Sequence, residues 1–135
     1  MNWLFKEEPG NYSFDELLKD GKTVWSGVRN PVAQRHLHAV SRGDRIFVYH
    51  TGKEKAVIGI AKALGHAYPD PEDKAGKQAI VDIAPVKKLP RPVTLAEIKA
   101  DPAFKTFALV RISRLSVMPV TDEEWERIIG KAGGS

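Results

Sequence analysis

The chain has 135 residues and a formal net charge of +4 at pH 7, with 42% hydrophobic and 28% charged residues. This length and this balance are typical of one globular domain that buries its own core. The chain contains no cysteine, which excludes disulfides, zinc–thiolate sites, iron–sulfur clusters and thiol catalysis.

Alternating or β-branched runs predict the strands, because side chains one and three of a strand share a face. In chain order, strands are expected at Asn2–Lys6, Arg45–His50, Val57–Leu64, Gln78–Lys87 and Val110–Val117. The polar stretch 66–77, which contains Pro69 and Pro71, is expected to be a surface loop.

Capping residues predict four short helices. The S/T-x-x-E spacing, in which the hydroxyl accepts a free N–H and the glutamate reaches back, recurs three times and favours helices over 13–19, 94–99 and 121–129. Asn30-Pro31 predicts a fourth, ending near Val40, since proline at the first helical position loses no hydrogen bond. Strands and helices mix without a βαβ rhythm, so we expect an α+β fold with a small curled sheet or partial barrel.

The two ends of the sequence suggest a compact domain with a short tail. Glu7, Glu8 and Pro9 stand where a signal peptide would need an apolar run. No apolar stretch approaches the roughly 18 residues of a membrane helix. We therefore expect a cytoplasmic protein that makes no membrane contact, with a domain over 1–130 and a flexible tail over 131–135.

Positive charge is concentrated in two segments. Residues 21–62 hold eight Lys/Arg against two Asp/Glu, and residues 85–114 hold seven against two. Two basic segments in a nearly balanced chain could converge on one anion-attracting face, or form an ordinary solvated surface. Charge alone does not choose between these interpretations.

Catalytic and metal-binding patterns are weak. His36 and His38 lie two apart on an expected helix and so point about 200° apart, which is unsuited to one metal ion. The sequence has no G-x-S-x-G, S-x-x-K or P-loop motif. We expect no enzyme activity, no cofactor and no metal; a small hydrolase using His50 and Glu8 is the catalytic alternative.

Aromatic and basic residues instead gather in a few short strings. Trp25 opens a loop in which Arg29 directly precedes the helix start at Asn30, where free N–H groups and the positive end of the dipole favour an anion. The alternative is structural, because a tryptophan such as Trp3 or Trp25 can be a core anchor and Asn30 can simply cap its helix.

Several strings in order resemble the EVE domain family, over residues 1 to about 129. They are Trp3-Leu4-Phe5-Lys6 with Glu8-Pro9, Trp25 with Gly27-Val28-Arg29-Asn30, Gly43-Asp44 with Tyr49-His50, Gly59-Ile60-Ala61, Ala67-Tyr68-Pro69-Asp70, and Arg114-Leu115-Ser116-Val117 with Pro119-Val120. The resemblance implies a PUA-like pseudo-barrel of five or six strands with flanking short helices. It also implies binding of nucleic acid whose modified base, modified cytosine in DNA first and a modified RNA base second, lies in an aromatic-lined pocket.

Transferred by position, the resemblance predicts the residues of such a pocket. The expected base-pocket residues are Trp3, Glu8, Pro9, Trp25, Ser26, Gly27, Val28, Asn30, Tyr49 and His50. Within them, Trp25 and either Tyr49 or Trp3 are expected to stack on the base. The expected phosphate-binding residues are Lys6, Arg29, Arg35, Arg114 and Ser116.

Two positions depart from the family pattern: Ser26 stands where many members have an acid, and Gln34 delays the following arginine to Arg35. The first affects which base edge is read, and the second moves a charge about 100° round the helix. A protein-interaction module that binds a peptide through Trp25 and Tyr49 is the non-catalytic alternative.

Overall fold

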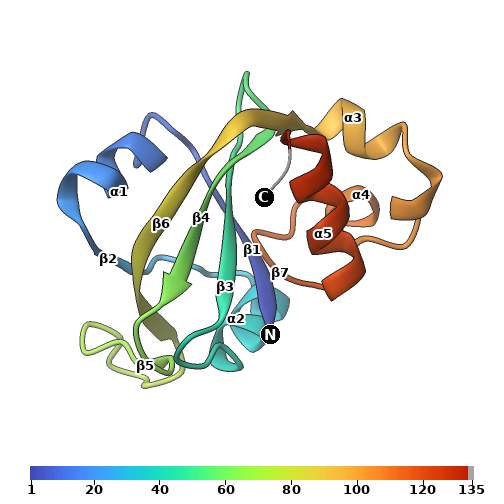
Figure 1. Ribbon diagram of the computed structural model, residues 1–135. Helices are drawn as coiled ribbons and strands as arrows, with labels where there is room; N and C mark the ends of the chain where they lie inside the picture. The colour runs from blue at the N-terminus through green and yellow to red at the C-terminus, as the bar shows by residue number, and fades with distance from the viewer. Residues whose placement is uncertain (134–135) are drawn as a thin grey trace.

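The strands form one strongly curled sheet with short helices at both sides, and the computed structural model describes residues 1–133 (Figure 1). The strand order is β2-β6-β4-β3-β1-β7, with β5 paired to β6 beside this path. The pair β1–β3 is parallel, and the other pairs are antiparallel. The elements are β1 (Asn2–Glu7), α1 (Phe14–Asp20), β2 (Thr23–Trp25), α2 (Pro31–His38), β3 (Arg45–His50), β4 (Ala56–Ala63), β5 (Tyr68–Pro69), β6 (Ala79–Thr94), α3 (Leu95–Lys99), η1 (Pro102–Phe104), α4 (Ala108–Arg111), β7 (Val117–Val120) and α5 (Asp122–Lys131).

All four helix starts predicted from capping residues are confirmed. Ser13, Thr94 and Thr121 each form the full capping box with the glutamate three residues later. Asn30 caps α2, and Pro31 occupies its first turn. These starts were predictable because a cap involves only neighbouring residues.

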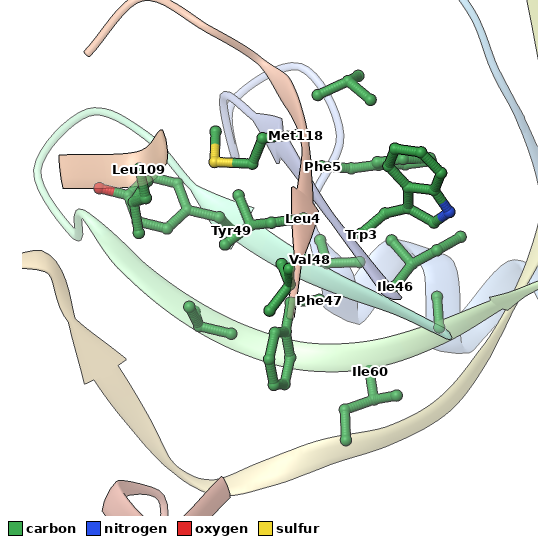
Figure 2. Close-up of a cluster of buried hydrophobic side chains, with 14 of the residues drawn as sticks. Trp3, Leu4, Phe5, Ile46, Phe47, Val48, Tyr49, Ile60, Leu109 and Met118 are labelled. Carbon is green, nitrogen blue, oxygen red and sulfur yellow. The ribbon is translucent and has the colours of Figure 1, made fainter. Parts of the chain in front are cut away.

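The strand β1 lies inside the sheet and is buried on both faces. Its neighbours are β3 and β7, and its side chains from Asn2 to Phe5 are all buried. Figure 2 shows Trp3 and Phe5 extending to one side, whereas Leu4 lies with Tyr49 and Leu109 on the other. Parallel central strands covered on both faces have this continuous apolar character.

The predicted strand over residues 110–117 is wrong. Helix α4 occupies Ala108–Arg111, a turn follows, and β7 begins only at Val117. The segment packs through Phe107 and Leu109, which are both buried. Because β7 pairs with β1 over four residues, the alternating residues before it have no ladder partner.

The strand β6 is longer than predicted, and it runs through three prolines. Its pairing with β4 shifts register between Val57 and Gly59 and again between Ile60 and Ala61. Pro90 and Pro92 lie between Lys88 and Val93, in a stretch of β6 with no paired residue in β4, where a proline has no ladder hydrogen bond to lose; Pro85 pairs with Ala61 directly beside the second shift. A proline-rich sequence therefore does not end this strand.

The C-terminal helix continues past the predicted domain boundary. Lys131 is in α5 and forms an ion pair with Asp101 at 3.1 Å, and Ala132 is buried. The predicted flexible tail is therefore wrong at 131 and 132, and residues 134–135 lie outside the described residues. In the described part of the chain, no helix is long and apolar enough to cross a membrane.

Acid is expected to destabilise the fold through Glu97. The Arg91 guanidinium donates to its carboxylate at 2.7 and 3.2 Å and, with the Thr94 N–H, lowers the pKa of Glu97 from 4.5 to about 2. As pH falls between these values, the unfolded chain takes up a proton that the folded chain does not, so acid favours unfolding. Because solvent screens this exposed pair, its contribution to the free energy of unfolding should be small.

Urea titrations across this pH window measure the effect. Glu97→Gln keeps the capping box but should reduce the loss of stability on acidification. Glu126→Gln, an exposed position on the same protein, should leave it unchanged. Equal acid sensitivity of all three proteins would contradict the assignment.

Candidate nucleic-acid interface

Trp25 is fixed by the sheet at the end of β2. It pairs with Val81 of β6, and its indole packs against Phe5 of β1 with ring centroids 5.3 Å apart and planes at 40°. Only 6% of the residue is exposed. Trp25 is thus both a core anchor, as the structural alternative held, and part of the wall of the hollow described next.

A small hollow of about 210 Å³ opens beside Trp25, and we call it the Trp25 hollow. It is lined by Glu7, Tyr12, Thr23, Val24, Trp25 and Ser26. It therefore combines two aromatic residues, Trp25 and Tyr12, with a carboxylate and hydroxyl groups. This volume suits one planar ring rather than a whole drug-sized ligand.

Sequence reasoning placed Trp25 and Ser26 here but missed Glu7, Tyr12 and Thr23. A signal for Glu7 existed, because residues two apart in a strand share a face and Phe5 packs on Trp25. Tyr12 comes from the loop before α1. Its hydroxyl donates to Asp20 at 2.8 Å. Partial burial is the largest cause that raises the pKa of Tyr12, and this hydrogen bond is the next.

A larger hollow of about 630 Å³ lies on the other side of the same strand end, and we call it the Tyr68 hollow. Ser26, Gly27 and Arg29 line it from one side, and Tyr68, Asp70 and Glu72 from the other. Val24 and Ser26 line both hollows. The two hollows therefore adjoin each other at the end of β2.

The loop between β2 and α2 is held in place by Gln34. Its side-chain amide donates to the Val28 carbonyl at 2.6 Å and accepts from the Ala79 N–H at 2.8 Å. Gly27 adopts a φ of +75°, which favours glycine. Gln34, which sequence reasoning noted only as a departure, thus ties this loop to the start of β6.

Two predicted base-pocket residues in this loop have structural roles. Val28 is buried. The Asn30 side-chain oxygen accepts from the N–H groups of Val32 and Ala33 at 2.9 and 3.0 Å, so it is engaged as a helix cap. Neither residue lines the Trp25 hollow.

The predicted stacking partners Trp3 and Tyr49 do not join Trp25. Trp3 is 2% exposed and donates its indole N–H to Asp44 at 2.9 Å. Tyr49 is buried on the opposite side of β1 from Trp3 and Phe5 (Figure 2). Burial raises the pKa of Tyr49. Both rings are core residues that line neither hollow, so the structure does not bring them together with the exposed part of Trp25.

His50 is buried with both ring nitrogens occupied. Nε2 accepts the Phe14 N–H at 3.0 Å, and Nδ1 lies 2.9 Å from the Glu54 carboxylate. The first contact requires an unprotonated Nε2, so the second is donated by Nδ1–H. His50 therefore accepts a hydrogen bond from the N-terminus of α1 and does not line the Trp25 hollow.

Replacing His50 with alanine should destabilise the fold by about 1–3 kcal/mol, because the buried Phe14 N–H loses its acceptor. His38→Ala is the matched control. His38 is exposed and its Nε2 lies 2.9 Å from the Lys77 carbonyl, so this change should stay within about 0.5 kcal/mol. Thermal and urea unfolding measure both variants, and equal effects would contradict the role assigned to His50.

Glu8 and Pro9 shape the turn that leads to Tyr12. The Glu8 carboxylate accepts from the Thr51 hydroxyl at 3.2 Å, and the Glu8 carbonyl accepts the Tyr12 N–H at 3.0 Å. Neither Glu8 nor Pro9 lines the Trp25 hollow. They were expected to line the base pocket. In the structure they form the turn that positions Tyr12, which does line the hollow.

The predicted phosphate-binding residues fall into separate groups. Lys6 is half-buried; its Nζ donates to the Ser113 carbonyl at 2.9 Å and its backbone N–H donates to the Ser116 carbonyl at 2.9 Å, whereas Arg29 lines the Tyr68 hollow. Burial lowers the pKa of Lys6. Within residues 1–133, Arg29, Arg35 and Arg114 are exposed and form no ion pair.

No metal-binding cluster of three or more His, Asp or Glu side chains is found among residues 1–133. His36 lies beside Trp3, with ring centroids 6.1 Å apart, and His38 lies against the Lys77 carbonyl. These two histidines therefore have different surroundings.

Known proteins are similar to this chain over nearly its whole length. The family model of the EVE domain matches residues 1–131. Thymocyte nuclear protein 1 of Homo sapiens is 30% identical over an alignment that covers 95% of this chain and 72% of that protein. The NMR structure of Rpa0253 from Rhodopseudomonas palustris has 46% sequence identity and a TM-score of 0.93, and covers 98% of this chain and 92% of that chain.

One similar structure contains DNA. The human THYN1 protein, crystallised in complex with 5-methylcytosine-containing DNA, is 29% identical with a TM-score of 0.88, and covers 99% of this chain and 98% of that chain. ASCH from Zymomonas mobilis, 14% identical with a TM-score of 0.57 over 96% of this chain and 94% of that chain, is similar in fold alone. The predicted α+β fold, a PUA-like curled sheet with short helices, is confirmed.

Proposed function

This chain belongs to the EVE domain family, and we propose that it is a non-catalytic module that binds nucleic acid carrying a modified base. Modified cytosine in DNA is the leading ligand, and a modified RNA base is the second. The observation that carries the proposal is the similar human THYN1 protein, whose crystal structure contains 5-methylcytosine DNA.

The chemistry of the Trp25 hollow favours cytosine. The indole offers a stacking wall, and the Glu7 carboxylate is the type of acceptor that binds the exocyclic amino group of cytosine. One Glu7 oxygen already accepts the Glu8 N–H at 2.8 Å, and a carboxylate has further lone pairs to offer. Ser26 and Thr23 supply hydroxyl donors for the base oxygen and ring nitrogen.

The surroundings of His50 support binding without catalysis. A histidine acting as a general base needs a nitrogen within reach of the substrate. Both nitrogens of His50 contact protein groups, and the residue is buried. A hydrolase that uses His50 would have to release Phe14 from its bond.

The expected affinity is modest. Extruding a base from a duplex costs a few kcal/mol, and stacking returns about 1–3 kcal/mol per base. A methyl group in an apolar wall adds roughly 10- to 200-fold selectivity. The unpaired Arg35 and Arg114 would meet phosphates and make binding fall with added salt.

Titration of fluorescently labelled single strands tests the proposal. The strands differ only in carrying cytosine, 5-methylcytosine or 5-hydroxymethylcytosine, as DNA and as RNA, at two salt concentrations. Preference for one modified strand, weakened by salt, is expected. Equal binding to every strand would refute modified-base recognition, and no binding at all would instead favour the protein-interaction module.

Two neighbouring glutamates provide a matched pair of variants for this titration. Glu7→Ala should lower affinity for the preferred strand because it removes the acceptor in the Trp25 hollow. Glu8→Ala removes a carboxylate that lies outside that hollow, and should change affinity much less. The reverse order would show that the base lies elsewhere.

A further inference from the structure

The Tyr68 hollow adjoins the Trp25 hollow, in which the proposed function places the modified base. Val24 and Ser26 line both. In a strand whose modified base enters the Trp25 hollow, the adjacent nucleotide therefore lies within reach of the Tyr68 hollow. Its volume of about 630 Å³ is ample for a purine.

Tyr68 offers this hollow a fixed aromatic surface. The strand β5 pairs Tyr68 with Ile80 of β6. The Tyr68 hydroxyl donates to Asp82 at 2.7 Å, and this bond raises the pKa of Tyr68. The residue remains 38% exposed. The hydroxyl therefore holds the ring in place, while part of the side chain stays accessible to solvent. Bases of any sequence stack on such a ring.

Two opposite charges remain available in the hollow. Arg29 is exposed and forms no hydrogen bond or ion pair with another side chain in the described part of the chain. Glu72 likewise accepts no hydrogen bond through its carboxylate among residues 1–133. Asp73, in contrast, uses both oxygens on the N–H groups of its own loop.

The acidic side of the hollow disfavours a phosphate. Residues 70–77 hold three acids and two lysines, and Asp70 and Glu72 line the cavity. A phosphate between them would be repelled, whereas a neutral ring with donors on one edge and acceptors on another satisfies both charges. Arg29 was expected to bind phosphate, and this arrangement suits it better to a base edge.

We propose that the Tyr68 hollow is a second base subsite that selects a guanine next to the modified base. Guanine offers O6 and N7 together, which is the pair that arginine reads by two hydrogen bonds. Its ring N–H and amino group are donors that match the Glu72 carboxylate. Adenine lacks O6, cytosine lacks N7, and thymine has no amino group, so none satisfies both Arg29 and Glu72. This inference rests on the proposed function, because the modified base sets the position of its neighbour.

The test uses labelled single strands with one preferred modified base, flanked on either side by guanine, adenine, cytosine or thymine. We expect guanine on one side to bind about 5- to 150-fold more tightly than thymine, the range for one bidentate base contact. Arg29→Ala and Glu72→Gln should each remove most of that preference while leaving thymine-flanked binding unchanged. Arg35→Ala, at another exposed arginine, should leave the preference intact.

Salt dependence separates base reading from phosphate contact. A base-reading Arg29 leaves the slope of log affinity against log salt unchanged in Arg29→Ala, whereas a phosphate contact lowers every affinity and reduces that slope by about 1. Uniform loss with a smaller slope would overturn the subsite. So would modified strands that bind equally well with every flanking base, although the proposed function would then stand.

A nucleotide titration tests the subsite even where no modified strand binds. NMR spectra of the protein are recorded with guanosine 5′-monophosphate and with thymidine 5′-monophosphate. Shifts around Tyr68 and Arg29 with the guanine nucleotide alone support the subsite independently of the Trp25 hollow. Absence of such shifts, or equal shifts with both nucleotides, would overturn it.

Discussion

Replacing Trp25 with alanine is expected to weaken binding of the preferred modified strand by about 5- to 150-fold. This corresponds to the loss of one base–aromatic stack, about 1–3 kcal/mol. Trp25 is the aromatic wall of the Trp25 hollow, and the ring of the other nearby aromatic residue, Tyr12, is held through its hydroxyl by Asp20. Fluorescence anisotropy of the labelled strand measures the change without relying on tryptophan emission.

The same substitution also removes a buried indole from its contact with Phe5, so stability must be controlled. Loss of a buried tryptophan costs about 3–5 kcal/mol. Trp125→Ala is the matched control, because Trp125 is equally buried and stacks on Phe47 at 3.6 Å without lining the Trp25 hollow. It should be destabilised to a similar degree but should bind the modified strand normally while folded.

Trp25→Phe provides the complementary variant. It keeps an aromatic face at the end of β2 and should recover much of the lost affinity. If Trp25→Ala binds like the native protein, or if Trp125→Ala loses binding equally at a temperature where both are folded, the base does not stack on Trp25.

The helices were predictable from the sequence because their starting signals are local. A capping residue and the glutamate three positions later define a helix start without reference to the rest of the chain. Asn30, Ser13, Thr94 and Thr121 all behave as predicted.

The sheet was less predictable because pairing depends on distant residues. The segment 110–117 alternates at both of its ends and changes face at Arg114-Leu115, and β7 pairs with β1 over only four residues. Conversely, β6 continues through Pro85, Pro90 and Pro92 because its register against β4 shifts at bulges. Neither fact can be read from a single segment.

The residues of the candidate site show the same difference between what neighbouring residues predict and what depends on distant parts of the chain. Trp25 and Ser26 were predicted by position from the resemblance to the EVE family, whereas Glu7 and Tyr12 join them only through the packing of β1 and the loop before α1. Trp3 and Tyr49 line neither hollow, although an aromatic residue in a strand has the same sequence signature in a core and in a pocket. Trp25 is also buried, and what separates it from these two residues is that part of it lines a hollow.

Gly59→Ala is expected to destabilise the fold by about 3 kcal/mol, the upper part of the range for overpacking a close-packed core. A Cβ at Gly59 in β4 would lie 2.5 to 2.7 Å from three carbons of the Phe14 ring. Phe14 is fully buried at the first turn of α1, with its N–H bonded to His50. The ring therefore cannot move away without displacing α1.

Gly65→Ala is the matched control for backbone effects. Gly65 has no atom within 4 Å of an added Cβ and no positive φ, so its substitution should change stability little or raise it slightly. Urea unfolding of both variants measures the difference. A Gly59→Ala protein as stable as Gly65→Ala would mean that α1 shifts at little cost.

A second-site change distinguishes a clash from a loss of strand flexibility. Combining Gly59→Ala with Phe14→Leu removes ring atoms from the space that the new methyl group needs. If the clash is the cause, the double variant should be less destabilised than the sum of the two single variants, because contacting residues couple. Strict additivity would assign the loss to β4 itself. A displaced α1 would also move the preceding loop that carries Tyr12 to the Trp25 hollow, so the Gly59→Ala protein should bind the modified strand more weakly even under conditions where it is fully folded.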